Sequence, residues 1–152
     1  MLSVALAALL LAAPAASPAP VREAWDRTPP RAGGAWVRAN PVPGRPAAGY
    51  ATIIGGGAPD KLIGAESPGL RIELHSMTSS GGVMKMAKLP ALPVPAGTTV
   101  ALASGGTHLM IVGLTGAPKS IPLVFRFGSG ATATTTAEVR APGAAADPHA
   151  GH

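Results

Sequence analysis

The side chains best suited to binding a metal ion lie close together in this sequence. The chain has four histidines and five methionines, and two of the histidines and four of the methionines fall in the segment from position 75 to position 110. The residues of this segment are His75, Met77, Met84, Met86, His108 and Met110. The other two histidines, His149 and His152, lie at the C-terminus.

The spacing within the segment predicts that the donors point in a common direction. His75-Ser76-Met77 and His108-Leu109-Met110 are both His-x-Met sequences. On a β-strand, positions i and i+2 face the same side of the sheet, so each imidazole projects beside a thioether. Residues 78–82 are predicted to form a flexible turn that returns the chain to Met84-Lys85-Met86. We therefore expect three methionines and two histidines to converge at one end of a β-sandwich.

This donor set favours a soft monovalent metal ion. Thioethers select Cu(I) and disfavour hard ions such as Mg²⁺ and Ca²⁺. Zinc prefers cysteine, histidine or carboxylate ligands, and Glu73 is the carboxylate nearest to the segment. A blue-copper electron-transfer centre needs a cysteine thiolate, and the sequence contains no cysteine. The residues thus indicate Cu(I) binding and exclude a blue-copper centre.

Two other interpretations concern the same residues. A methionine stripe is more often core filling than a ligand set, so packing is the alternative for Met84, Met86 and Met110, and packing or support of the ligands is the alternative for Met77. An enzyme is not expected. Glu73 and His75 share a strand face, but no Ser-His-Asp or two-carboxylate arrangement accompanies them.

The elements that would position these residues are short strands. Apolar or alternating runs are separated by turn sequences rich in Gly and Pro, and no segment keeps a helical period. The predicted strands are 35–38, 49–54, 61–65, 70–74, 98–103, 108–114, 121–127 and 131–139. This pattern predicts an all-β fold, a Greek-key β-sandwich or barrel, over residues 35–140.

The two ends of the chain have different compositions. Residues 1–20 are uncharged and rich in Leu and Ala, with small residues after the apolar run. This is typical of a signal peptide, although no Lys or Arg precedes the apolar run; a disordered Ala/Pro-rich tail is the alternative. Residues 21–34 are predicted to be a disordered Pro/Arg-rich segment, and residues 141–152 a flexible tail that contains His149 and His152.

Composition and charge exclude several classes of function. The 152 residues carry a formal charge of +5, and much of the excess lies in the Pro/Arg-rich segment. Only five aromatic residues are present, too few to provide stacking platforms for bases. The apolar leader run is too short to span a bilayer, for which about 20 residues are needed. We therefore expect no nucleic-acid partner and no membrane span in the mature chain.

The segment from 75 to 110 resembles the signature of the periplasmic copper chaperones of the PCuAC type. That signature is a His, ten residues, a Met, about twenty residues and then His-x-Met. Here ten residues separate His75 from Met86, and twenty-one separate Met86 from His108-Leu109-Met110. The stretches 82–86, 94–97 and 105–110 also look like family sequence, whereas Gly55-Gly56-Gly57 stands where the family usually has a polar turn.

The resemblance implies a cupredoxin-like β-barrel that binds one Cu(I) through His75, Met86, His108 and Met110. Met77 and Met84 are thioethers outside the signature. For each of them we expect packing or support of the ligands, and a relay or replacement of a ligand is the alternative. Some family members bind Cu(II) with a His- or Met-rich C-terminal extension, and residues 147–152 with His149 and His152 resemble a minimal version. A solvated end without function is the alternative for this tail.

The function that follows is an exported, periplasmic copper metallochaperone. It would bind Cu(I) and pass it to an acceptor, which the family implies is an oxidase subunit or a thiol-containing factor in cytochrome oxidase copper-site assembly. The alternative is a protein that sequesters or buffers copper or silver. Whether the leader is cleaved or retained as an anchor is left open by the sequence.

Overall fold

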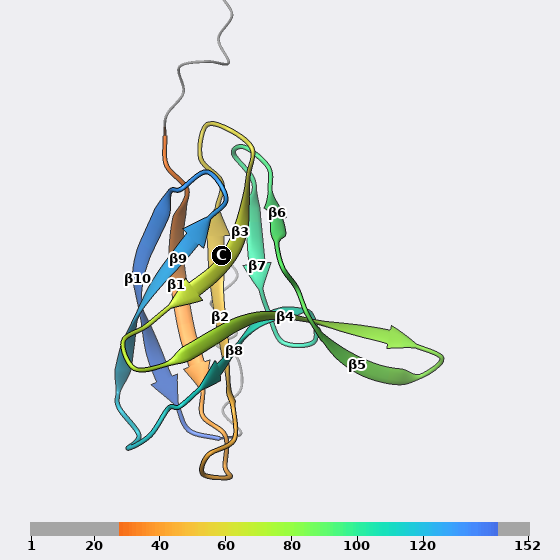
Figure 1. The fold of residues 1–152 in the computed structure, drawn as a ribbon, viewed down its shortest axis with the longest axis vertical. Helices are drawn as coiled ribbons and strands as arrows, with labels where there is room; N and C mark the ends of the chain where they lie inside the picture. Colours follow the sequence, from red (N-terminus) through yellow and green to blue (C-terminus); the bar gives the residue numbers. More distant parts are fainter. Residues whose placement is uncertain (1–27, 143–152) are drawn as a thin grey trace, which may run out of the picture.

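The computed structural model describes residues 28–142, which form ten β-strands and no helix (Figure 1). The strands are β1 (Arg31–Arg38), β2 (Ala47–Ile54), β3 (Asp60–Glu66), β4 (Arg71–Ser80), β5 (Val83–Lys88), β6 (Leu92–Val94), β7 (Thr99–Leu102), β8 (Thr107–Val112), β9 (Ser120–Phe127) and β10 (Thr132–Arg140). The prediction of an all-β fold is confirmed.

All ten strands are hydrogen-bonded into one sheet that bends around a single core. The order is β5-β4-β8-β2-β1-β10-β9-β3-β6, and β7 pairs with β2 off this path. One part of β2 pairs with β8 and the following part pairs with β7, so these two strands share the same edge of β2. Strands β1 and β10 run parallel, and the other pairs are antiparallel.

Alternation of side chains builds the core. In β9, every second residue from Ile121 to Phe127 is buried, and the residues between them are more exposed. The paired strand β10 buries Ala133 and Ala137, and the residues on either side of each are exposed. Burying a side chain such as Phe125 contributes about 1.5–3 kcal/mol to folding. The same core contains Leu74 of β4 and Leu109 of β8, the two strands that carry the histidines.

The β4–β5 hairpin projects from the body of the domain (Figure 1). Ser80 and Val83 are its last pair, so Gly81 and Gly82 form a two-residue loop. Both glycines have positive φ, 58° and 79°, as a type I′ turn requires. All six residues of β5 are exposed, and β5 is the edge strand of the sheet. The hairpin therefore displays its side chains to solvent.

The strand prediction missed two strands and misplaced several boundaries, above all the end of β4 and the start of β1. β5 and β6 were not predicted, and the turn expected over residues 78–82 is confined to Gly81 and Gly82, because β4 continues through Ser80. β1 begins at Arg31, four residues before the predicted start, because Arg31, Ala32 and Gly33 pair with β2. The sequence analysis had assigned residues 31–34 to the Pro/Arg-rich segment because of their composition.

Several predictions concern parts of the chain outside the described residues. The signal peptide, residues 21–27 of the Pro/Arg-rich segment, and residues 143–152 with His149 and His152 all fall there. Within residues 28–142, no helix long and apolar enough to cross a membrane is present.

Candidate metal centre

His75 and His108 face each other on adjacent strands. The antiparallel register of β4 and β8 makes them direct partners, and their ring centroids lie 6.3 Å apart with the planes inclined by 32°. Both side chains are buried, with 9% and 5% of their surface exposed. Direct partners in an antiparallel pair present their side chains on the same face of the sheet.

Met110 lies on the face that carries the two histidines. It follows His108 by two residues on β8 and pairs with Glu73, which precedes His75 by two residues on β4. The intervening residues Leu74 and Leu109 pair with each other and are buried in the core on the opposite face. The two strands thus separate an apolar core face from an outer face that carries imidazole, thioether and carboxylate groups.

The remaining methionines continue this face onto the hairpin. Met77 of β4 pairs directly with Met86 of β5, and Met84 pairs with Ser79. Because His75 pairs with Lys88, Met86 is its diagonal neighbour. Met84 and Met86 each expose 52% of their surface, so the core-filling alternative is wrong for these two residues. Met77 and Met110 are half-buried.

The structure therefore brings the six predicted donors of the segment onto one face of three adjacent strands, β5, β4 and β8. The donors run along the strands at one border of the sheet, whereas the sequence analysis expected them at one end of a sandwich. His149 and His152 lie outside the described residues.

A hydrogen bond with Glu73 fixes the tautomer of the His75 ring, that is, which of its nitrogens carries the proton. His75 Nε2 lies 3.0 Å from Glu73 Oε2, and an ionised carboxylate only accepts hydrogen bonds, so Nε2 carries the proton. Nδ1 then presents its lone pair. Among residues 28–142, Nδ1 of His75 is the buried side-chain polar atom that has no hydrogen-bond partner. An orphaned buried imidazole nitrogen fits a metal ligand, whose other ring nitrogen usually donates to a carboxylate or carbonyl.

A hydrogen bond to the backbone fixes the opposite tautomer in His108, with the proton on Nδ1. Its Nδ1 lies 3.2 Å from the carbonyl oxygen of Gly106. A carbonyl oxygen accepts hydrogen bonds, so Nδ1 donates, and Nε2 is the nitrogen with a lone pair. The two rings therefore offer one basic nitrogen each.

The charge of Glu73 is maintained by its neighbours. The hydrogen bond from His75 is the main cause that lowers the pKa of this carboxyl, and the charges of Lys88 and Arg71 lower it further against an opposing effect of desolvation. Lys88 Nζ and Arg71 Nη2 lie 3.6 and 3.5 Å from Oε1. One carboxylate oxygen thus faces the two cations while the other accepts from His75. Sequence reasoning considered Glu73 as the carboxylate nearest to the donor segment and as an acid–base candidate, but not as a residue that orients His75; its i−2 spacing from His75 was the available signal.

Aromatic residues that sequence reasoning did not assign to the site extend from His108 across β2 and β1. The Tyr50 ring centroid lies 6.5 Å from that of His108, and Trp36 lies 4.6 Å from Tyr50. Arg38 Nη2 donates to the Tyr50 hydroxyl over 2.9 Å. Both aromatic rings are buried, so they give His108 a rigid neighbour on one side.

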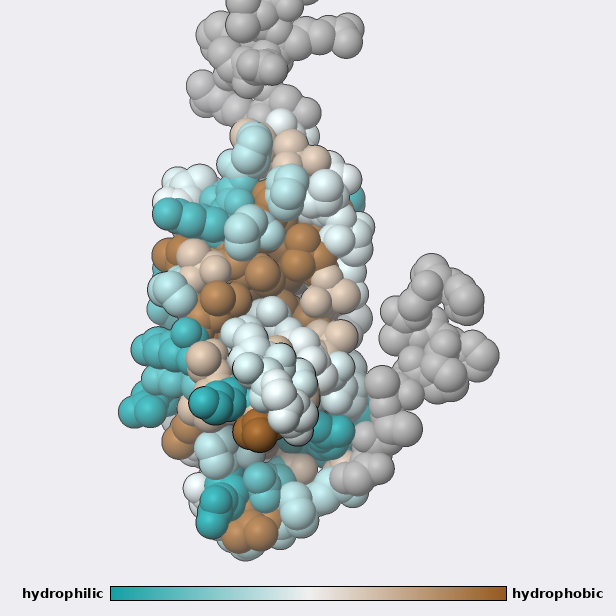
Figure 2. Space-filling view, turned by 90° about the vertical axis from the view of Figure 1, so that its right-hand side faces the viewer, coloured by the Kyte–Doolittle hydropathy of each residue, from teal (hydrophilic) through white to brown (hydrophobic). Residues whose placement is uncertain are grey.

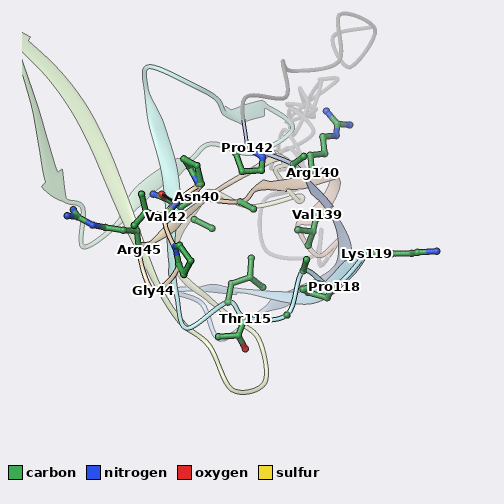
Figure 3. A pocket seen from close by; sticks show the side chains of 18 residues that line it. Asn40, Val42, Gly44, Arg45, Thr115, Pro118, Lys119, Val139, Arg140 and Pro142 are labelled. Carbon is green, nitrogen blue, oxygen red and sulfur yellow. Dashed lines mark hydrogen bonds between the residues drawn. The ribbon is translucent and has the colours of Figure 1, made fainter.

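A hollow of the surface lies away from the six predicted donors. It is bordered by the loop after β1, the loop between β8 and β9, and the end of β10, and none of its lining residues is His or Met. Figure 3 shows the side chains of Arg45, Lys119 and Arg140 extending away from this hollow. This hollow therefore contains none of the predicted metal donors that lie within residues 28–142.

Within the described part of the chain, no group of three or more His, Cys, Asp or Glu residues has a geometry that could hold a metal ion. A centre at His75 and His108 would therefore take its further ligands from the methionine sulfurs of the same face.

Comparison with known proteins agrees with this architecture. Residues 31–139 match the model of the family described as "Putative lipoprotein LpqE-like". Putative lipoprotein Lxx21020 of Leifsonia xyli subsp. xyli is 29% identical over 110 residues, which cover 70% of this chain and 66% of that protein. The chain thus spans slightly less than two thirds of this curated relative.

Three solved structures show the same fold. The copper-bound PCuAC domain from PmoF2 is 23% identical to this chain. The match covers 74% of this chain and 93% of the PmoF2 domain, with a TM-score of 0.59. The Cu(I) form of DR1885 from Deinococcus radiodurans is 28% identical over 78% of this chain and 83% of its own, with a TM-score of 0.56. Apo-DR1885 is 30% identical; the match covers 93% of this chain and 95% of the DR1885 chain, with a TM-score of 0.52. The resemblance to PCuAC-type proteins and the cupredoxin-like fold are confirmed, and the chain belongs to the LpqE-like family.

Proposed function

We propose that this protein is an exported copper metallochaperone that binds Cu(I) through His75, Met86, His108 and Met110 and passes it to an acceptor. The observation that carries the proposal is the direct pairing of His75 with His108. Met110 and Met86 are diagonal neighbours of His75 on either side, on the same face of the sheet.

The donor set suits Cu(I) in both softness and charge. Two neutral imidazoles and two thioethers form a soft ligand field. The lone pairs of His75 Nδ1 and His108 Nε2 follow from the hydrogen bonds to Glu73 and to the Gly106 carbonyl. No thiolate is involved, so the centre does not compete with disulfide chemistry in an oxidising compartment.

The same arrangement allows release. Thiolate and imidazole ligands compete with protons, whereas a thioether can be displaced without a proton transfer. Met86 is half exposed on the edge strand β5, so a donor atom of an acceptor can approach this ligand from solvent. We infer that acceptor donors first replace Met86, while the buried histidines hold the cargo.

Export and the acceptor follow from the leader and the family. The apolar leader supports passage out of the cytoplasm, and the family description as a lipoprotein agrees with export. Two of the three solved structures compared above are named as copper-bound or Cu(I) forms. We propose an oxidase subunit or a thiol-containing assembly factor as acceptor, and a Cu(II) site at His149 and His152. The Glu73–His75 pair orients a ligand in this scheme, so we propose no enzymatic activity.

A second function, sequestration of copper or silver, is favoured by one observation. Met77 and Met84 add two thioethers to the same face, which would raise the number of ions bound. A buffer should bind several equivalents and release them slowly, whereas a carrier should bind one tightly and yield it to an acceptor.

The test is an anaerobic Cu(I) titration of the chain from Arg22 onward against a competing chelator. The variants are His108→Ala with Met110→Ala, and a chain that ends at Arg140. Tight one-to-one binding that is lost in the double variant and kept in the truncated chain would support the carrier. Several weak equivalents that the double variant leaves unchanged would contradict it. A parallel Cu(II) titration of the full and truncated chains tests the tail, because loss of Cu(II) binding in the truncated chain would support the site at His149 and His152.

A further inference from the structure

We propose that the β4–β5 hairpin carries a second soft-metal site, made of the thioethers of Met77, Met84 and Met86, which loads the histidine centre. This inference rests on the proposed function and extends it, because it assigns a place where the monovalent ion enters the protein.

The register of the hairpin groups the three sulfurs. Met77 and Met86 are direct partners, and Met84 is the diagonal neighbour of Met77 because it pairs with Ser79. Direct partners have Cβ atoms about 4.5–5.5 Å apart and diagonal neighbours about 7–8 Å apart. Methionine has three rotatable bonds beyond Cα, so all three sulfurs can reach one point above this face.

The exposure of the hairpin does not match a packing role. Of the large hydrophobic side chains exposed within residues 28–142, three lie on β5: Val83, Met84 and Met86. Figure 2 views the domain from the side on which the hairpin projects; the surface at its centre is mostly pale, with a brown patch beside a teal one, and a broader brown area lies above it on the body of the domain. Packing against the domain therefore does not explain these two methionines.

The exposed hydrophobic side chains of β5 are divided between the two faces of the hairpin, which argues against an apolar docking surface. Val83 points to the face opposite Met84, together with Lys85, because strand residues alternate. Met84 and Met86 share their face with Met77 and the polar Ser79. This face of the hairpin thus presents three thioether groups and no continuous apolar area.

The charges around the hairpin suit a monovalent cation bound by neutral ligands. No Asp or Glu lies on β5 or on β4 beyond Glu73. Lys85 faces the other side, and Lys88 is paired with Glu73 at 3.6 Å. A hard divalent ion would find no carboxylate here, whereas Cu(I) or Ag(I) needs only soft donors.

Met86 connects the hairpin site to the histidine centre. It is the direct partner of Met77 and the diagonal neighbour of His75. An ion held by three thioethers can therefore move toward His75 and His108 by ligand exchange. Each step forms one bond to nitrogen or sulfur as one bond to sulfur breaks, with no proton released and no change of oxidation state.

The experiment is a titration with Ag(I), a redox-stable probe for Cu(I), of the chain from Arg22 onward labelled with ¹³C at the methionine methyl groups. Met77, Met84, Met86 and Met110 are each assigned by substitution with Leu. We expect the first equivalent to shift Met86 and Met110, and a second, weaker equivalent to shift Met77 and Met84. Met84→Leu should weaken the second equivalent at least tenfold, and Val83→Ala, on the other face of the same strand, should leave it unchanged.

The loading rate gives a second readout. In stopped-flow mixing with a Cu(I)–chelator complex, Met84→Leu should slow loading several-fold and leave the affinity of the first equivalent unchanged. Methyl signals of Met77 and Met84 that stay fixed through several equivalents, while Met86 and Met110 shift, would overturn the hairpin site and leave the carrier proposal standing. Shifts confined to Met77, Met84 and Met86, with Met110 unmoved, would support metal binding by the hairpin but overturn both the centre proposed at His75, Met86, His108 and Met110 and its loading from the hairpin.

Discussion

His75 and His108 are direct partners across β4 and β8, and their ring centroids lie 6.3 Å apart on the outer face of the sheet. One residue further along the same strands, Ser76 pairs with Thr107 and faces the other way. This relationship supplies both a test of the centre and its control.

Replacing either histidine with Ala should lower Cu(I) affinity more than about 100-fold, because the loss of a ligand should exceed the 10- to 100-fold effect of outer partners. Chelator competition measures the change. Ser76→Ala with Thr107→Ala alters the same strands on the opposite face and should keep the native affinity. Equal affinities for His75→Ala and the control would remove His75 from the centre.

Glu73 should act through the orientation of His75. Its Oε2 accepts from Nε2 of that ring, so Glu73→Ala should weaken Cu(I) binding about 10- to 100-fold. Glu73→Gln should lose less, because an amide oxygen still accepts the hydrogen bond. Glu66→Ala removes a carboxylate that pairs with Arg126 on another strand pair, and we expect it to bind copper normally. An unchanged Cu(I) affinity in Glu73→Ala would show that Glu73 does not act through the orientation of His75 and contributes only charge.

The core face beneath the centre should control folding. Leu109 lies between His108 and Met110 and is fully buried. Leu109→Ala should destabilise the metal-free protein by about 2–5 kcal/mol, measured by urea unfolding. Met84→Leu, at an exposed position, should change the free energy of unfolding by less than about 0.5 kcal/mol. A similar loss in both variants would contradict the division of the strands into core and metal faces.

Acid should weaken the fold through Asp60. Burial raises the pKa of this carboxyl, but hydrogen bonds from the Ser129 hydroxyl and from the backbone N–H groups of Lys61 and Ser129 outweigh that effect, so the pKa lies below its ordinary value of 3.8. A group whose pKa is depressed by folding stabilises the native state above its unfolded pKa, and this contribution is lost as the pH falls through the folded pKa.

The corresponding test compares the wild-type chain with Asp60→Asn. The difference in free energy of unfolding should be largest above pH 5 and should shrink as the pH falls below 3.8. Chemical denaturation at a series of pH values measures it. A difference that stays constant from pH 6 to pH 2.5 would show that the ionisation of Asp60 does not contribute.

Much of the fold and of the candidate site could be predicted from the sequence because both depend on a period of two. Alternating apolar residues in the segments at 121–127 and 131–139 predicted two strands, and the structure has β9 and β10 there. β6 was missed because it is a three-residue edge strand that contains Pro93. β5 was missed because its six residues are all exposed and carry no core pattern.

The sequence by itself predicted two pairs of residues that share a face within a strand, His75 with Met77 and His108 with Met110. Met84 and Met86 share a face because they lie on β5, a strand that the sequence pattern did not predict. Local backbone geometry is sufficient for the two predicted pairs, since successive side chains of a strand point to opposite sides. It also determined the softness of the donor set, because no cysteine is present and few carboxylates lie nearby.

Only the tertiary structure decided how the three pairs meet. A shift of one residue in the register of β4 against β8 would place His75 opposite a residue of the other face, and that register depends on packing Leu74 and Leu109 into a core shared with distant strands. The exposure of Met84 and Met86 depends likewise on β4 continuing past β8 to pair with β5. Pairing between segments distant in sequence, which no local pattern specifies, thus set the geometry of the candidate site.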